Sequence, residues 1–369
     1  MHRTTLLRVA ALLSVLLLPL SAQAHRQSDP PHQTLPLGKF TLESGQAIED
    51  FSLSYVTHGT LNADKSNAIL MVTAIGGNHH RLDFLIGPGK ALDTDKYFVI
   101  CTDAIGNGLT TSPSNSTLQH GPKFPEYNIR DMVNSQYPLV TRHFGIRKLV
   151  AVVGASMGGM QALQWAVSYP DMMQAIVPIV PLVNTPGWTV SVLEMLRRSI
   201  MSDPVYNGGS YEKPPEAGMR LWASWFSGVI LRTPQYQDKL LATPANSLEF
   251  ISKAADNNWK NVDANNWISQ SRAYERHDLG TTKGFGGDTV KALKSIKART
   301  LILVGTGDLL NPEENAQIAG REIADARVVN INDRAPMGHF SAAGATADEV
   351  EVMNREIRTM LDSLTIKAK

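Results

Sequence analysis

The sequence predicts a doubly wound α/β fold, in which a mostly parallel sheet carries helices on both faces and is interrupted by an inserted helical cap. Short runs of apolar and β-branched residues alternate with segments of helical periodicity. These runs are apolar throughout, which is typical of strands buried on both faces of a parallel sheet. From residue 184 to about residue 287 the alternation stops and no strand pattern is found.

Residues 1–24 have the layout of a secretory signal peptide. Two arginines precede an apolar run at residues 9–20, and Ala22-Gln23-Ala24 supplies the small residues that a signal peptidase needs. The run is shorter than the roughly 20 apolar residues that span a bilayer, so a membrane anchor is the less favoured alternative. We expect cleavage after this tripeptide, export to the periplasm or the medium, and no membrane association of the mature chain.

Composition excludes several other classes of protein. The net charge of +1 and the lack of a basic stripe argue against nucleic-acid binding. Cys101 is the single cysteine and lies in an apolar run, so we expect a buried hydrophobic side chain and no disulfide. The pair His79-His80 is interpreted as part of a loop rather than as metal ligands. No metal and no cofactor are therefore expected.

The first part of the predicted core covers residues 25–183. It opens with two antiparallel strands joined around Ser44-Gly45, and the parallel strands follow, each ending at turn residues. The expected strands cover residues 37–42, 51–58, 68–75, 97–103, 149–153 and 175–180, and the expected helices cover residues 130–144 and 157–169.

The predicted cap covers residues 184–287, and the second part of the core covers residues 288–369. Five of the six tryptophans lie in the cap, and we expect most of them to form its hydrophobic core rather than to stack on a ligand. The sheet pattern resumes at residues 300–304 and 327–331, and an amphipathic helix is expected at residues 347–364.

Gly154-Ala155-Ser156-Met157-Gly158 forms a G-x-S-x-G motif between an apolar strand and a helical run. A nucleophile elbow requires this strand-turn-helix context, in which the serine occupies a strained conformation at the helix N-terminus. The helix dipole there favours negative charge that develops during a reaction. The alternative is an ordinary glycine-rich turn. We predict that Ser156 is a nucleophile.

A nucleophilic serine needs a general base, and that base needs a carboxylate to orient it. Asp308 follows the strand that resumes after the cap, and His339 lies near the end of the chain, which is the order expected for this fold. Asp325 and Asp333 are rival carboxylates, and His277 in the cap is the only other histidine after the elbow.

The oxyanion of an acyl-transfer reaction needs preorganised N–H donors, each contributing roughly 3–4 kcal/mol. One predicted donor is the backbone N–H of Met157, next to the nucleophile. The other is the N–H of Ile75 in the loop after the strand at residues 68–75, with Gly76 as the second choice, because glycines there allow close approach of the backbone.

Three longer segments, residues 85–102, 128–133 and 154–170, resemble the homoserine O-acetyltransferase family, a branch of the α/β-hydrolases. The resemblance covers residues 38–181 well and residues 300–339 more loosely. It implies the α/β-hydrolase fold, a triad of Ser156, Asp308 and His339, and a possible homodimer formed through the cap.

The chain departs from this family where the amino-acid substrate would bind. Family members place an aspartate after the catalytic histidine to bind the ammonium group, and this chain has Phe340 there. They also carry a cap arginine for the substrate carboxylate, and Arg220 is out of register with it. Both charges of an amino acid need partners in a closed site, so homoserine is disfavoured as the acceptor.

Export also favours water over acetyl-CoA as the second reactant. We therefore predict a serine hydrolase that acts on small carboxylic esters through an acyl-serine intermediate. The alternative is an O-acyltransferase that uses an acyl-CoA donor. A third hypothesis, a non-catalytic binding module, is disfavoured because all three residues of a triad are present.

Overall fold

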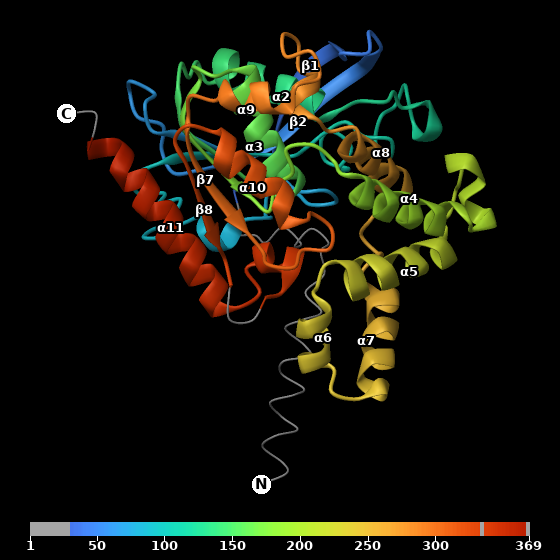
Figure 1. Ribbon diagram of the computed structural model, residues 1–369. Coiled ribbons are helices and arrows are strands. Elements are labelled where there is room, and N and C mark those ends of the chain that lie inside the picture. The colour runs from blue at the N-terminus through green and yellow to red at the C-terminus, as the bar shows by residue number, and fades with distance from the viewer. Residues whose placement is uncertain (1–29, 333–335, 367–369) are drawn as a thin grey trace.

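The computed structural model describes residues 30–332 and 336–366 (Figure 1). The predicted signal peptide, residues 1–24, and the rival Asp333 lie outside these residues. Within them, no helix has the length and apolarity needed to cross a membrane.

An eight-stranded sheet forms the centre of the molecule, in the order β1-β2-β4-β3-β5-β6-β7-β8. β1–β2 and β2–β4 pair antiparallel, and every other neighbouring pair is parallel, so the predicted mostly parallel sheet is confirmed. The strands are β1 Gln33–Thr41, β2 Ala47–His58, β3 Ala68–Val72, β4 Phe98–Thr102, β5 Leu149–Ala155, β6 Met173–Ile179, β7 Arg299–Val304 and β8 Ala326–Asn330.

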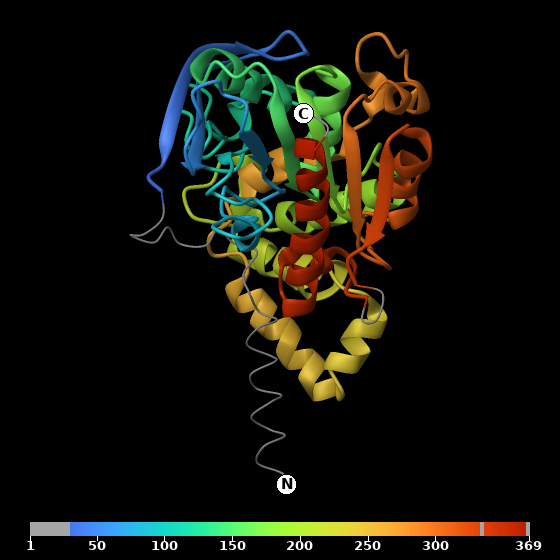
Figure 2. The same cartoon turned by 90° about the vertical axis from the view of Figure 1, so that its left-hand side faces the viewer.

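The central strands β3 and β5 are apolar throughout because helices cover both faces of the sheet. In β3, Leu70 and Val72 belong to one hydrophobic cluster, whereas Ile69 and Met71 belong to a second cluster on the opposite face. The first cluster includes side chains of α2, α3, α9 and α10, and the second includes side chains of α11, which crosses the other face (Figure 2). These helices are α2 Ile129–Pro138, α3 Met157–Ser168, α9 Thr289–Lys294, α10 Glu313–Glu322 and α11 Ala347–Ile366.

The helix predicted at residues 130–144 is divided into two parts. α2 begins with a capping box, in which Asn128 and Asp131 bond each other's backbone N–H groups. It ends at Pro138, and a π-helical turn, Leu139–His143, follows. Pro138 has no backbone N–H to donate, which is a local reason for the change of helix type at this point.

The residues predicted to form the cap are helical and lie between β6 and β7. α6 and α7 project away from the sheet in both views (Figures 1 and 2). Trp222 and Trp267 are buried against each other with ring centroids 5.3 Å apart, as expected for a cap core, but Trp188 and Trp225 are 55% and 51% exposed. The helices are α4 Gly187–Met201, η4 Pro204–Gly209, α5 Glu216–Trp225, η5 Phe226–Ile230, α6 Pro234–Leu240, α7 Pro244–Asn257, α8 Ala264–Glu275 and η6 Leu279–Thr281.

Candidate active site

Ser156 lies at a sharp turn between the end of β5 and the start of α3. Its φ of 59° and ψ of −120° are strained for a residue with a side chain. Its N–H donates to the carbonyl of Ile179 at 2.8 Å, which anchors the turn to the neighbouring strand β6. The turn therefore has the geometry of a nucleophile elbow.

The glycines on either side of Ser156 allow α3 to lie unusually close to the sheet. A Cβ atom at Gly154 would lie 2.4 Å from the carbonyl oxygen of Gly158, and a Cβ at Gly158 would lie 2.5 Å from that of Val72. Both distances are shorter than any van der Waals contact. The motif is thus required by backbone packing as well as by the turn.

The structure brings Ser156, His339 and Asp308 together. Nε2 of His339 lies 2.9 Å from Oγ of Ser156, and Nδ1 of His339 lies 2.7 Å from Oδ2 of Asp308. His339 is carried by a 3-10 helix, Gly338–Ala343, after β8, and Asp308 follows β7. All three side chains are buried. Residues far apart in the sequence therefore form one continuous hydrogen-bonded chain.

The second oxygen of Asp308 is held by the backbone. Oδ1 accepts the N–H groups of Leu310 and Asn311, each at 2.8 Å. These bonds leave Oδ2 directed at the imidazole, which favours the tautomer with a proton on Nδ1.

The rival residues lie in other environments. Asp325 is 63% exposed at its side chain and pairs with Arg299 at 3.1 Å. His277 is buried with Nε2 3.0 Å from the carbonyl of Leu182, and burial lowers its pKa to about 4. Since that carbonyl can only accept, Nε2 carries a proton and the ring is neutral.

Two residues near the nucleophile were missed by the sequence analysis. The hydroxyl of Tyr274, on the cap helix α8, lies 3.4 Å from Oγ of Ser156 and 2.5 Å from Oδ1 of Asn311. Asn311 in turn donates from Nδ2 to the carbonyl of Val180 at 2.7 Å. Helical periodicity places Tyr274 on a buried face of α8, but nothing in that pattern indicates that the face lies over Ser156.

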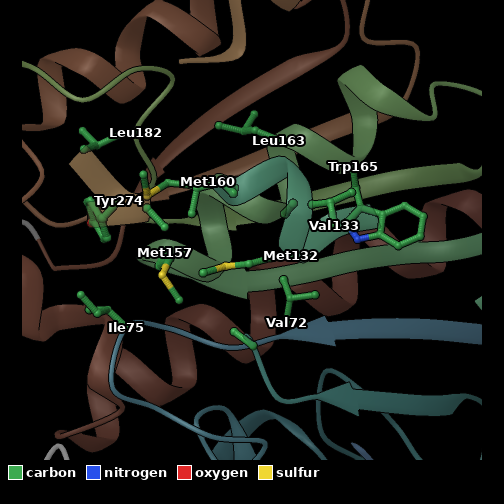
Figure 3. Packing of buried hydrophobic residues seen from close by; sticks show 14 of the residues in the cluster. Val72, Ile75, Met132, Val133, Met157, Met160, Leu163, Trp165, Leu182 and Tyr274 are labelled. Carbon is green, nitrogen blue, oxygen red and sulfur yellow. The ribbon is translucent and has the colours of Figure 1, made fainter. Parts of the chain in front are cut away.

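Of the predicted oxyanion residues, Met157 directly follows Ser156 and Ile75 lies in the loop after β3. Ile75 and Met157 are both buried, and Figure 3 shows them with Tyr274 at the end of α3 opposite Trp165. The N–H of Gly76 donates to Oε1 of Gln270 at 2.8 Å, so the second-choice donor is already bonded to the cap. The N–H groups of Ile75 and Met157 remain the predicted donors.

A cavity of about 520 Å³ opens beside the same loop, and Gln270 and Trp267 of α8 line it. Gln270 precedes Tyr274 by one helical turn, so α8 contributes to this cavity and also reaches Ser156, although Ser156, Asp308 and His339 do not line the cavity. Its lining is mainly glycine and neutral amide, without lysine or arginine: His32, Gly76, Gly77, Asn78, His80, Gly106, Asn107, Gly108, Leu109, Ser114, Asn261, Val262, Asp263, Asn266, Trp267 and Gln270.

Phe340 packs against a cap arginine, and Arg220 pairs with a cap carboxylate. The Phe340 ring is buried beneath the guanidinium of Arg232, 4.2 Å from the ring centroid. Burial lowers the pKa of Arg232 to about 10, so it stays charged at neutral pH. Arg220 is 40% exposed at its side chain and pairs with Asp256 at 2.6 Å, between α5 and α7.

The other side chains singled out from the sequence have structural environments. Nδ1 of His79 lies 3.0 Å from Oδ2 of Asp103, and Nδ1 of His80 lies 2.8 Å from Oδ2 of Asp83, which orders the loop after β3. Cys101 is buried in β4, as predicted, and burial raises the pKa of its thiol well above the usual value.

The fold and the site together define the class: an α/β enzyme with a serine at a strand-to-helix turn beneath a helical cap. Residues 67–343 match the model of the alpha/beta hydrolase fold. The chain belongs to this family, in the branch that contains homoserine O-acetyltransferases.

Relatives in this branch carry two kinds of name. The chain is 34% identical over 345 residues to a homoserine O-acetyltransferase of Leptospira biflexa serovar Patoc, covering 84% of this chain and 88% of the relative. It is 31% identical over 344 residues to a protein of Corynebacterium glutamicum named as a probable esterase, covering 90% and 96%.

Solved structures divide in the same way. An acetylester hydrolase from Corynebacterium glutamicum superposes with a TM-score of 0.83 at 29% identity, covering 90% of this chain and 96% of that one. A homoserine O-acetyltransferase from Bacillus anthracis superposes with a TM-score of 0.77 at 26% identity, covering 90% and 97%. The protein is therefore an enzyme, with ester hydrolysis and acyl transfer as the two candidate activities.

Proposed function

We propose that the protein is a serine hydrolase that cleaves carboxylic esters through an acyl-serine intermediate. The main observation behind this proposal is the chain of hydrogen bonds from Ser156 through His339 to Asp308. In acylation His339 takes the Ser156 proton as Oγ attacks the ester carbonyl, and it then protonates the departing alcohol. Asp308 stabilises the imidazolium, and the N–H groups of Ile75 and Met157 stabilise the oxyanion.

Charge distribution supports an ester over an amino-acid acceptor. The residue that follows His339 is Phe340, an uncharged side chain whose ring contacts the guanidinium of Arg232, so it offers no carboxylate of its own to an ammonium group. The neutral substrate of an esterase has no such requirement.

The alternative is an O-acyltransferase with an acyl-CoA donor, favoured by the names of the homoserine O-acetyltransferase relatives. Both reactions share the acyl-serine and differ in the nucleophile that resolves it. The phosphates of an acyl-CoA call for cationic partners, and among the described residues none of those that line the cavity beside Gly76 is a lysine or an arginine. Hydrolysis is therefore the proposed reaction.

The test uses purified mature protein with short p-nitrophenyl esters and a fluorophosphonate probe. We expect turnover and labelling in the wild type, and loss of both in Ser156→Ala. Ser168→Ala, at the other end of α3, is the matched control and should keep both. Ester and thioester donors offered with and without homoserine, scored by product mass, distinguish hydrolysis from transfer. Acyl-homoserine formed faster than free acid would overturn the proposed reaction.

We also propose that the protein is exported and dimerises through the cap. Export rests on the layout of residues 1–24. Dimerisation rests on exposed apolar side chains of the cap, among them Trp188, Met195, Trp225 and Leu248. Export is tested by the N-terminal sequence of the protein recovered from outside the cytoplasm. Dimerisation is tested by comparing the sedimentation of the wild type with that of Trp225→Glu.

A further inference from the structure

The hydroxyl of Tyr274 has a defined hydrogen-bond direction. The backbone carbonyl of Val180 can only accept, so the side-chain atom of Asn311 that faces it is the NH₂ group. Oδ1 of Asn311 therefore faces Tyr274 and can only accept, so the Tyr274 O–H donates to it at 2.5 Å. The only hydrogen of this hydroxyl is thus used, and its oxygen can act toward Ser156 as an acceptor alone.

Two acceptors therefore converge on the nucleophile. Nε2 of His339 lies 2.9 Å from Oγ of Ser156, and Oη of Tyr274 lies 3.4 Å from it. The shorter contact takes the single serine proton in the free enzyme. Tyr274 stays a neutral phenol, because burial and the nearby Asp308 charge raise its pKa far above neutrality while its bonds to Ser156 and Asn311 only partly offset this.

We propose that Tyr274 is a specificity-determining residue that favours water over an alcohol as the nucleophile that resolves the acyl-serine. This inference rests on the proposed acyl-serine chemistry. Once Ser156 is acylated its Oγ has no proton. His339 and Tyr274 then present two acceptors beside Oγ, at 2.9 and 3.4 Å, to the second nucleophile. Water has two hydrogens to satisfy both acceptors, whereas an alcohol has one.

The step balances without any further reactant. The water oxygen attacks the acyl carbonyl carbon while one water hydrogen passes to Nε2 of His339 and the other remains bonded to Oη of Tyr274. The C–Oγ bond then breaks, and His339 returns the proton to Oγ of Ser156. The products are a carboxylic acid and the free enzyme. An attacking alcohol would direct a carbon substituent at the Tyr274 oxygen, which costs a hydrogen bond and crowds the site.

The experiment is nucleophile competition in Tyr274→Phe, which removes the oxygen and keeps the ring. With p-nitrophenyl acetate and added methanol, the ratio of methyl acetate to acetate measures the choice between the nucleophiles. We expect this ratio to rise about 3- to 10-fold, the effect of one hydrogen bond. A larger p-nitrophenol burst should accompany it, because deacylation by water slows while acylation continues.

Tyr169→Phe is the matched control. The Tyr169 hydroxyl also donates to an asparagine Oδ1, that of Asn134 at 2.8 Å, but Tyr169 follows the C-terminal end of α3. Its substitution removes a bond of the same kind and should leave the product ratio unchanged.

A merely structural role of Tyr274 would lower both products equally, and an unchanged ratio would overturn the inference. A wild-type protein that neither reacts with the probe nor hydrolyses the ester would instead overturn the proposed function.

If Tyr274→Phe does not fold, Asn311→Ala gives a second test. This substitution frees the Tyr274 hydrogen, so the hydroxyl can donate to an alcohol oxygen. The ratio should again rise, and a constant ratio contradicts the proposal.

Discussion

Nδ1 of His339 lies 2.7 Å from Oδ2 of Asp308, and both side chains are buried. The carboxylate is itself held by two backbone N–H groups, so it can orient the imidazole without moving. This relationship makes the role of Asp308 directly testable.

Asp308→Asn should lower kcat by about 10³- to 10⁴-fold, because an amide at this position stabilises the imidazolium poorly and permits the wrong tautomer. Steady-state kinetics with a p-nitrophenyl ester measures the loss. Asp325→Asn is the control, since Asp325 is the exposed rival carboxylate. Equal losses in the two variants would contradict the assignment.

Gly158→Ala should destabilise the fold, because the new methyl group would lie 2.5 Å from the backbone oxygen of Val72. We expect a decrease in the free energy of unfolding of about 3 kcal/mol, measured by urea denaturation. Gly187→Ala, in the first turn of α4 with no atom within 4 Å of the added Cβ, should change it little. A Gly158→Ala protein as stable as wild type would show that α3 can shift away from β3.

Gln270→Glu should lower kcat/KM about 10-fold. Gln270 accepts from the N–H of Gly76 and donates to the carbonyl of Ile105, and a carboxylate cannot make the second bond. The loop that carries Ile75 should shift as a result. Gln164→Glu, a buried glutamine two turns along α3 from Ser156, is the comparison. A similar loss of activity there would point to general destabilisation.

Stability should fall with rising pH because of Glu349. Burial raises the pKa of this carboxyl from 4.5 to about 7. Below pH 4.5 the carboxyl is protonated in both the folded and the unfolded state. Above pH 7 the folded state holds a buried carboxylate, so the free energy of unfolding decreases as the pH rises between these values. Glu349→Gln should flatten this dependence, with a gain approaching about 3 kcal/mol at pH 8 relative to pH 4.

Glu351→Gln, an exposed position on the same helix, is the control for that experiment. Denaturation curves at both pH values give the comparison, and a pH dependence unchanged by Glu349→Gln would rule out this carboxyl as its source.

Most of the fold is predictable from the sequence because the central parallel strands, such as β3 and β5, are uninterrupted apolar runs. β3 and β5 lie within two or three residues of the predicted ranges, since burial on both faces leaves no position for a polar side chain. The helix at residues 130–144 is one departure, because Pro138 divides it. The first two strands are another, because β1 and β2 each begin four residues before the predicted ranges.

Ser156, Asp308 and His339 were predicted from the G-x-S-x-G motif between a strand and a helix and from the order of the three residues along the chain. This works because the elbow and the loops after the last strands lie at the same edge of a parallel sheet. The contacts made by the cap depend on how α8 lies across that edge, and no local pattern carries this information. The sequence alone therefore determined the parallel sheet, the elbow and the order of the three residues. Only the tertiary structure decided that Tyr274, Asn311 and Gln270 reach the site, because the packing of the cap on the sheet depends on contacts between residues more than a hundred positions apart in the chain.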